Sequence, residues 1–305
     1  MRIAFIGLGS IAQKHIAAIR EIDDNAILFA VRHKENTPEV KGIENIPFNS
    51  LASQKLDAII LSNPSVYHQK SIIDLAPLGI PLMVEKPICI SLDQWSALDQ
   101  LAKKNPPPIY IACNLRFHPL IQFLQRYLQE QPEVIYEVTS YCGSYLPAWR
   151  PELNYTDSYS AKSSMGGGVQ FDLIHELDYL TYLLGEPLEI EKQYRRISNL
   201  LIDSYDYAHY LATYQEFSAS ITLNYFRKDS KRTLEIVREN DTLLLNFIKG
   251  NIINLNTDKT LISIDKEGLY LSYLNQMKYF LHTIKTKNNL MNSLDESLRI
   301  IKTIL

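Results

Sequence analysis

Three glycines precede a run of chemically active side chains in GGGVQFDLIHELDYL, residues 166–180. The polar members of this run are Asp172, His175, Glu176 and Asp178. Asp172 and His175 are three positions apart, so they share one face of the helix that we expect from about residue 169 to Gly185. A carboxylate beside an imidazole favours the imidazolium ion, and the pair can therefore relay a proton to or from a substrate oxygen.

Two other interpretations of this stretch compete with proton transfer. A metal site would need ligands from elsewhere in the chain, because His-Glu-x-x-Asp lacks the second histidine of the zinc motif His-Glu-x-x-His. We therefore expect no metal. A polar helix face accounts for Glu176 but not for the glycines, since glycine costs conformational entropy and indicates that a ligand approaches the backbone closely.

A second glycine pattern lies in RIAFIGLGSIAQKH, residues 2–15. RIAFIG is typical of a short buried strand, and the following residues repeat apolar side chains at helical spacing. The spacing fits G-x-G-x-x-G/A, in which the first glycine makes the turn, the second admits a pyrophosphate and the small third residue packs helix on strand. We expect a dinucleotide to bind at Gly7, Gly9, Ser10, Ile11 and Ala12.

Basic residues end the next apolar run, AILFAVRHK. An acidic residue at this place binds the ribose 2′-hydroxyl of NAD, whereas a basic group suits the 2′-phosphate of NADP. Arg32 and His33 therefore favour NADP over NAD as the cofactor. The alternative is a solvated run of charges.

Strands and helices alternate through the first 118 residues, with DAIILSNP and PLMVEKPI as further strands. This alternation predicts a doubly wound parallel sheet. Ser91 and Gln94 form a capping box, which places Glu85, Lys86 and Pro87 just beyond the carboxyl end of a strand. Ligands of such sheets bind at that end.

Five motifs in sequence resemble the Gfo/Idh/MocA oxidoreductases: the glycine turn, Asn63-Pro64 with His68, the triplet at 85–87, RFHP at 116–119, and the glycine run with Asp172 and His175. The resemblance implies an α/β fold with an N-terminal Rossmann domain over residues 1–118. It implies a C-terminal α/β domain with an open, mainly antiparallel sheet over residues 119–305. It also implies a cofactor site that includes Asn63, Pro64, His68, Glu85, Lys86 and Arg116.

The same resemblance implies that Lys86, Asp172 and His175 are catalytic and bind substrate, and that the Lys86–Pro87 peptide is cis. A partly buried lysine shuttles protons, and as a cation it stabilises an alkoxide. The family usually places its histidine four residues after the aspartate, whereas here His175 follows Asp172 by three. Whether Lys86 or His175 is the main acid/base therefore stays open, with Asp178 as a supporting residue.

A tyrosine-rich loop, SYLPAWRPELNYTDSYSAKSSM at 144–165, precedes the glycine run. Aromatic faces and hydroxyls suit sugars, and an arginine grips a carboxylate or phosphate bidentately. We expect substrate contacts from Arg116, Trp149, Arg150 and Tyr155. The strings WRP, NY, YSA and GGG resemble a subgroup associated with bacterial surface-sugar gene clusters, including those for nonulosonic acids.

Composition limits the other partners. The chain has 305 residues, 46% hydrophobic side chains and a formal net charge of -3, so nothing favours nucleic acid. Three scattered cysteines and the lack of a long apolar stretch favour a cytoplasmic protein that does not enter a membrane. Six strand-like segments between residues 135 and 248 predict one sheet with a polar face, closed by helices near 268–286 and 292–304. The open face predicts a homo-oligomer, either a dimer or a tetramer.

Two hypotheses for function follow. The first is an NAD(P)-dependent oxidoreductase that moves a hydride between nicotinamide and a hydroxyl or keto carbon of a sugar, a small-molecule substrate. The second is a non-catalytic dinucleotide- or sugar-binding regulator that keeps the fold. Lys86, Asp172 and His175 together favour the enzyme, because a sensor needs the glycine turn but not the acid/base set.

Overall fold

The structure, a computed structural model, describes residues 1–32, 40–265 and 267–305. It divides into two compact units, of which the first comprises Met1–Asn114, Tyr273–Thr303 and Leu305, and the second Leu115–Ser272 and Ile304. The boundary expected at residue 118 lies close to the observed one. Assigning all of 119–305 to one domain differs from the structure, because the chain returns to the first unit at Tyr273.

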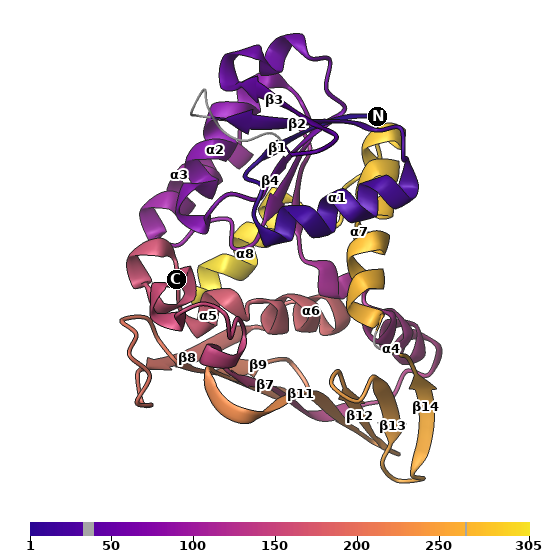
Figure 1. The fold of residues 1–305 in the computed structure, drawn as a ribbon. Helices are drawn as coiled ribbons and strands as arrows, with labels where there is room; N and C mark the ends of the chain where they lie inside the picture. The colour runs from indigo at the N-terminus through magenta and orange to yellow at the C-terminus, as the bar shows by residue number, and fades with distance from the viewer. Residues whose placement is uncertain (33–39, 266) are drawn as a thin grey trace. The chain divides into compact units, whose positions relative to one another are not determined.

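The first unit contains a parallel sheet of six strands in the order β3-β2-β1-β4-β5-β6 (Figure 1). All four residues of β4 are fully buried, because helices cover both faces of such a sheet and its strands become continuous apolar runs. This order confirms the predicted doubly wound sheet. The strands are β1 (Arg2–Ile6), β2 (Ile27–Arg32), β3 (Ile43–Pro47), β4 (Ala58–Leu61), β5 (Leu82–Glu85) and β6 (Ile109–Ala112).

Helices follow the strands of this unit. Ser91 caps the helix after β5 as predicted, accepting a hydrogen bond from the Gln94 amide at 3.3 Å. The helices are α1 (Ser10–Ile22), α2 (His68–Leu75) and α3 (Leu92–Ala102), with short 3₁₀ turns η1 (Phe48–Ser53), η2 (Ser65–Tyr67) and η3 (Ala76–Leu78).

The C-terminal helices α7 (Gly268–Thr286) and α8 (Leu294–Ile304) correct one expectation. From Tyr273 onward they pack in the first unit rather than on the second sheet. The Tyr110 hydroxyl donates to Gln276 Oε1 at 3.3 Å, and the Trp95 indole donates to the Leu298 carbonyl at 2.9 Å. These bonds tie β6 and α3 to α7 and α8.

The second unit is built on an eight-stranded sheet in the order β14-β13-β12-β11-β7-β10-β9-β8 (Figure 1). Only the β7 and β10 pair is parallel, so the sheet is mainly antiparallel as predicted. Its strands are β7 (Ile135–Tyr145), β8 (Glu189–Arg195), β9 (Tyr207–Thr213), β10 (Ser218–Asn224), β11 (Phe226–Arg238), β12 (Thr242–Asn246), β13 (Asn251–Asn254) and β14 (Lys259–Ser263).

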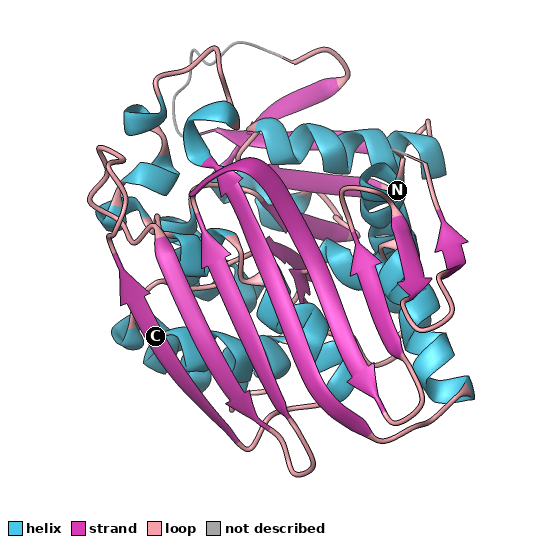
Figure 2. Cartoon of the chain, turned by 90° about the horizontal axis from the view of Figure 1, so that it is seen from below, coloured by secondary structure: helices cyan, strands magenta, loops and turns pink. Residues whose placement is uncertain are grey.

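The two faces of this sheet differ. Side chains that alternate along the strands, such as Val138, Ile221 and Ile236, are buried on one face, where α5 packs on β9 and β10. Figure 2 looks onto the other face, where polar residues and a few apolar ones are exposed. The helices of this unit are α4 (Pro119–Glu130), α5 (Val169–Asp172) and α6 (His175–Leu184), and its 3₁₀ turns are η4 (Asn114–Phe117), η5 (Leu146–Ala148), η6 (Tyr155–Asp157), η7 (Tyr159–Ala161) and η8 (Ser163–Met165).

Candidate active site

The glycine turn joins β1 to α1. Gly7 has φ +94°, and a Cβ added to it would lie 2.6 Å from the Asn63 backbone nitrogen, so only glycine fits. Gly9 is the N-cap of α1, and a Cβ there would meet nothing within 4 Å. Space therefore remains beside Gly9, where Ser10 and Ile11 begin the helix and its first amides lack helical partners. Ala12 is fully buried, which satisfies the close packing of helix on strand.

A cavity of about 600 Å³ lies beyond this turn and is lined by Gly7, Asn63 and Pro64, as well as by Arg32 at the end of β2. The Arg32 Nε donates to Asn45 Oδ1 at 2.9 Å, which leaves the rest of its guanidinium group beside the cavity. His33, the other predicted basic contact, lies outside the described residues. The structure thus brings the glycine turn, Arg32 and the Asn63-Pro64 pair to one cavity.

His68 holds two loops together instead of presenting a nitrogen to a ligand. Its Nδ1 lies 2.7 Å from the Pro87 carbonyl oxygen and its Nε2 lies 2.8 Å from the Asn63 carbonyl oxygen. The ring is buried, and burial lowers its pKa despite the two carbonyls. Its inclusion among the cofactor contacts therefore differs from the structure, where its role is to fix Asn63 and the residues next to Lys86.

Lys86 follows directly after β5, half-buried, and its peptide bond to Pro87 is cis. The preceding Glu85 is 8% exposed, and its Oε1 lies 2.7 Å from Nε2 of the fully buried His15 on α1. His15 lies on the helix that follows the glycine turn, but no motif of the sequence marks it as part of the site. Its ring anchors Glu85 and so restricts the backbone that carries Lys86.

The stretch around Asp172 corrects the expected single helix. Asp172 is the last residue of α5 and His175 the first of α6, with a turn at residues 173–174 between them. Asp172 is 6% exposed, whereas His175 is half-buried. The chain has one residue fewer between them than the family pattern, and the helix breaks at that place.

Two tyrosine hydroxyls surround the Asp172 carboxylate. The Tyr225 hydroxyl donates to Asp172 Oδ2 at 2.6 Å. The negative charge of Asp172, followed by burial, raises the pKa of Tyr159 well above its ordinary value, while the Arg150 charge opposes this. Burial and then Asp172 raise the pKa of Tyr225 as well. Both phenols therefore stay protonated and can donate to the carboxylate.

The glycine run makes room for protein rather than for a ligand, which corrects our expectation. A Cβ on Gly167 would lie 2.2 Å from the Tyr159 carbonyl oxygen and 2.6 Å from that of Ser160. Gly166 and Gly168 have φ of 80° and 127°. These glycines let η7 and η8 pack directly on the chain entering α5, and this contact positions Tyr159.

Arg116 and Glu176 also differ from expectation. The Arg116 guanidinium is 1% exposed and donates to both carboxylate oxygens of Asp178, at 2.9 and 2.7 Å, so it does not present itself to a cofactor or substrate. Asp178 is therefore the counter-ion of Arg116. Glu176 is fully buried and pairs with Arg232 at 2.5 Å, so it belongs to the interior and not to a polar helix face.

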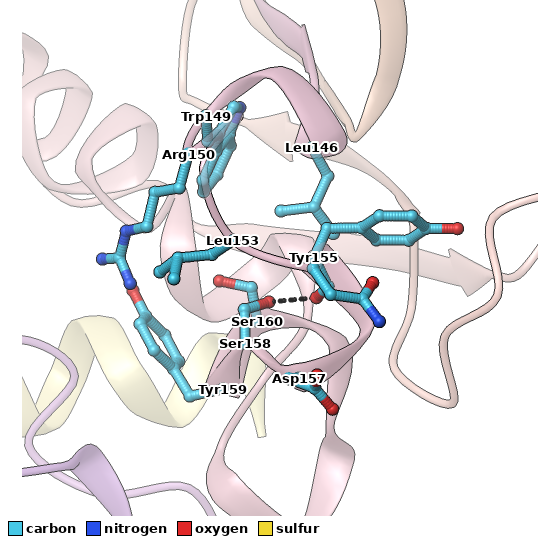
Figure 3. Close-up of a pocket in the computed structure, with 10 residues that line it drawn as sticks. Leu146, Trp149, Arg150, Leu153, Tyr155, Asp157, Ser158, Tyr159 and Ser160 are labelled. Atoms are coloured by element: carbon cyan, nitrogen blue, oxygen red, sulfur yellow. Dashed lines mark hydrogen bonds between the residues drawn. The ribbon is translucent and has the colours of Figure 1, made fainter.

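A cavity of about 290 Å³, which we call the loop pocket, is formed by residues 146–160 (Figure 3). Trp149, Arg150 and Tyr155, all predicted substrate contacts, line it together with Tyr159. The Trp149 indole donates to Ser144 Oγ at 2.8 Å and meets the Tyr225 ring edge-on at 5.4 Å. The pocket therefore adjoins the tyrosines that hold Asp172.

Lys86 belongs to the first unit, and Asp172 and His175 belong to the second. Within the described ranges, no three histidine, cysteine, aspartate or glutamate side chains are grouped so as to hold a metal ion. No helix in the part of the chain that the structure describes is both long and apolar enough to span a membrane.

Residues 1–112 match the family model described as the oxidoreductase family with an NAD-binding Rossmann fold, the Gfo/Idh/MocA model. The first 112 residues are therefore similar to the NAD-binding domain of this family. The chain is 27% identical over 202 residues to a myo-inositol 2-dehydrogenase of Thermotoga maritima, a match that covers 62% of this chain and 56% of that protein. The chain thus matches little more than half the length of that relative.

Two solved structures of dehydrogenases share the fold of this chain. The WlbA dehydrogenase from Bordetella pertussis, in complex with NADH and UDP-GlcNAcA, has a TM-score of 0.81 at 17% identity and covers 100% of this chain and 93% of that one. A levoglucosan dehydrogenase in complex with NADH has a TM-score of 0.82 at 15% identity, with coverage of 98% and 94%. At such identities the likeness concerns the fold.

Proposed function

We propose that the protein is a nicotinamide-dependent oxidoreductase that acts on a hydroxyl or keto carbon of a sugar or sugar derivative. The observation that carries this proposal is that a glycine turn fit for a dinucleotide and an acid/base set occur together in one chain that is similar to this family. The similarity to inositol and sugar dehydrogenases supports it. The strings of the 144–165 loop extend the proposal to surface-polysaccharide or nonulosonic acid biosynthesis.

The residues present fit a dinucleotide. The open space at Gly9 and the first amides of α1, which have no partner within the helix, suit a pyrophosphate, and the cavity beside Arg32 suits an adenosine ribose. When bound, the nicotinamide supplies a carbon that accepts or gives a hydride. We infer a preference for NADP over NAD because Arg32 ends β2, where an acidic residue would favour NAD.

Side chains of the protein transfer the proton to or from the substrate oxygen. The ammonium of Lys86 stabilises negative charge on a substrate oxygen, or the neutral amine accepts its proton. Asp172 accepts a hydrogen bond from the Tyr225 hydroxyl, and His175 is the second candidate for the proton transfer. The acid/base role remains divided between Lys86 and His175 in this proposal.

The first test is a titration of the purified protein with NADH and NADPH, followed through nicotinamide fluorescence. We expect tighter binding of NADPH, and Arg32→Ala should weaken it by about tenfold through loss of a charge-assisted hydrogen bond. Lys41→Ala removes an exposed positive charge nearby in sequence and should leave binding unchanged. Tighter binding of NADH would reverse the cofactor preference alone, and binding of neither would defeat the proposed function.

The second test separates the enzyme from a binding protein. Lys86→Ala should retain dinucleotide binding and lose turnover by two or more orders of magnitude on whichever polyol or sugar the parent protein oxidises, typical for a general acid/base. Turnover equal to that of the parent would remove Lys86 from the chemistry.

Homo-oligomer formation belongs to the same proposal. Leu211 on β9 is exposed between the buried Tyr210 and Ala212, so it lies on the face of the eight-stranded sheet opposite to the buried one, the face that Figure 2 looks onto. A sheet face that buries apolar side chains on a second copy is a common basis for symmetric dimers. Light scattering at micromolar concentration should give twice or four times the mass of one chain, and a single-chain mass would refute this part.

A further inference from the structure

Arg150 differs from the four arginines of the second unit that pair with carboxylates. The four pairs are Arg116 with Asp178, Arg227 with Asp229, Arg232 with Glu176 and Arg238 with Asp241. The exposed Arg150 side chain makes no hydrogen bond or ion pair with any residue of the ranges that the structure describes. Its guanidinium donors are therefore available to a ligand.

The loop pocket gives that guanidinium a defined setting. Arg150 and Tyr159 line the same cavity, and Figure 3 shows the guanidinium group directed toward the Tyr159 hydroxyl. Tyr159 is 39% exposed, and its phenol also responds to the charge of Asp172. A ligand beside Arg150 would therefore lie close to the candidate acid/base group of this unit.

The remaining walls suit a sugar ring. Trp149 is 38% exposed and is fixed by its bond to Ser144, so it offers a flat apolar face in one orientation. Asp157 also lines the pocket, but its carboxylate points away from the Arg150 guanidinium (Figure 3). A volume of about 290 Å³ suits a ligand portion of about one sugar ring.

We propose that the loop pocket binds an anionic sugar and that Arg150 binds its carboxylate or phosphate group. The inference rests on the proposed function, since this sugar is the substrate or the part of it next to the reacting carbon. A guanidinium forms two parallel hydrogen bonds with either anion, which a neutral sugar cannot accept in the same way. The sugar ring stacks on Trp149, and Arg150 selects the acid over its neutral analogue.

Trp149 provides the measurement. The chain has two tryptophans, so Trp95→Phe leaves Trp149 as the sole reporter. This variant is titrated with D-glucuronate, D-glucose 6-phosphate and D-glucose, and the change in tryptophan fluorescence gives a Kd for each. We expect at least one of the two anionic sugars to bind about tenfold or more tightly than glucose. Glucuronate and glucose 6-phosphate distinguish a carboxylate from a phosphate ligand.

Arg150→Gln in the same background should weaken binding of the anionic sugar by about tenfold or more and leave that of glucose unchanged, because one charge-assisted pair is lost. Arg196→Gln makes the same change at an exposed arginine outside the pocket and should have no effect. Equal binding of all three sugars, or an Arg150→Gln variant that binds the acids as the parent does, would overturn the inference.

The outcome is separable from that of the proposed function. Dinucleotide binding is measured on the same variants through nicotinamide fluorescence, and the residues that carry it lie in the first unit. Dinucleotide binding without preference for an acid leaves the oxidoreductase proposal intact and removes the anionic substrate. Preference for an anionic sugar without dinucleotide binding supports the anionic-sugar site and refutes the oxidoreductase proposal.

Discussion

The buried pair of Arg116 and Asp178 gives the sharpest test of how the second unit is held together. Both side chains are 1% exposed, and the guanidinium donates to the two carboxylate oxygens at 2.9 and 2.7 Å. Asp178→Asn keeps the size of the side chain and removes its charge, so that a buried guanidinium loses its counter-ion. Breaking a pair of this kind costs about 3–5 kcal/mol of unfolding free energy.

Urea unfolding followed by Trp149 fluorescence in the Trp95→Phe background reports on the unit that contains the pair. Asp229→Asn is the matched control, because it breaks the pair with Arg227 at 2.6 Å in the same unit while the Asp229 side chain is 82% exposed. Its urea midpoint should equal that of the parent, since water solvates an exposed arginine that loses its partner.

A double variant, Arg116→Met with Asp178→Leu, separates the pair's contribution from the cost of an unpaired charge. Removing both charges leaves no buried ion without a partner, so this variant should be more stable than Asp178→Asn. A loss below about 1 kcal/mol for Asp178→Asn, in the range of surface pairs, would refute the claim that the pair is desolvated.

Three further predictions concern the site and its supports. Gly9→Ala should weaken dinucleotide binding by about tenfold or more without changing the melting temperature, because the added Cβ meets no protein atom but fills the space left for a phosphate. Fluorescence titration measures the affinity and thermal unfolding measures the melting temperature. An unchanged affinity for the dinucleotide would contradict this prediction. Gly167→Ala places a Cβ 2.2 Å from the Tyr159 carbonyl and should lower stability by about 1–3 kcal/mol while displacing Tyr159, measured by urea unfolding and Trp149 fluorescence. Burial, followed by the charge of Arg232, lowers the pKa of His118 to about 4. The stability that the neutral ring contributes is therefore complete above the unfolded pKa of about 6.5 and is lost as the pH falls toward 4. The expected loss of unfolding free energy is on the order of 3 kcal/mol. His118→Asn retains an N-cap acceptor and should flatten that pH dependence; equal slopes for parent and variant would exclude His118 as its source.

Much of the first unit could be predicted because its signals are local. A parallel strand buried on both faces is a continuous apolar run, and β1, β4 and β5 could be identified in that way. The glycine turn was identifiable because its spacing directly follows an apolar run and precedes a helical pattern, although the backbone that excludes a Cβ at Gly7 is that of Ser62 and Asn63. Strand β3 was missed because IENIP has no such run, and NIIN and KTLIS, which form β13 and β14, are too short and polar to predict.

The candidate site was predictable in its residue types but not in its contacts. Asp172 and His175 are neighbours in sequence, yet Tyr225 reaches Asp172 from 53 positions away, and periodicity carries no information on such a pairing. The glycine run was predicted to lie against a ligand. Consecutive glycines in a sequence indicate that another group approaches the backbone closely, but they do not identify whether that group is a ligand or another part of the chain. Arg116 and Glu176 were misread because a charged residue is normally exposed, and their buried partners lie 62 and 56 positions away.

The return of the chain to the first unit has a consequence for synthesis on the ribosome. The Tyr110 hydroxyl bonds to Gln276, which is synthesised 166 positions later, and the Trp95 indole bonds to Leu298, which is synthesised 203 positions later. The nascent six-stranded sheet therefore emerges without the segment Tyr273–Thr303 that completes its packing, while the second unit, apart from Ile304, emerges before that segment. Translation order makes the dinucleotide-binding candidate, although first in sequence, the last of the two units to be completed.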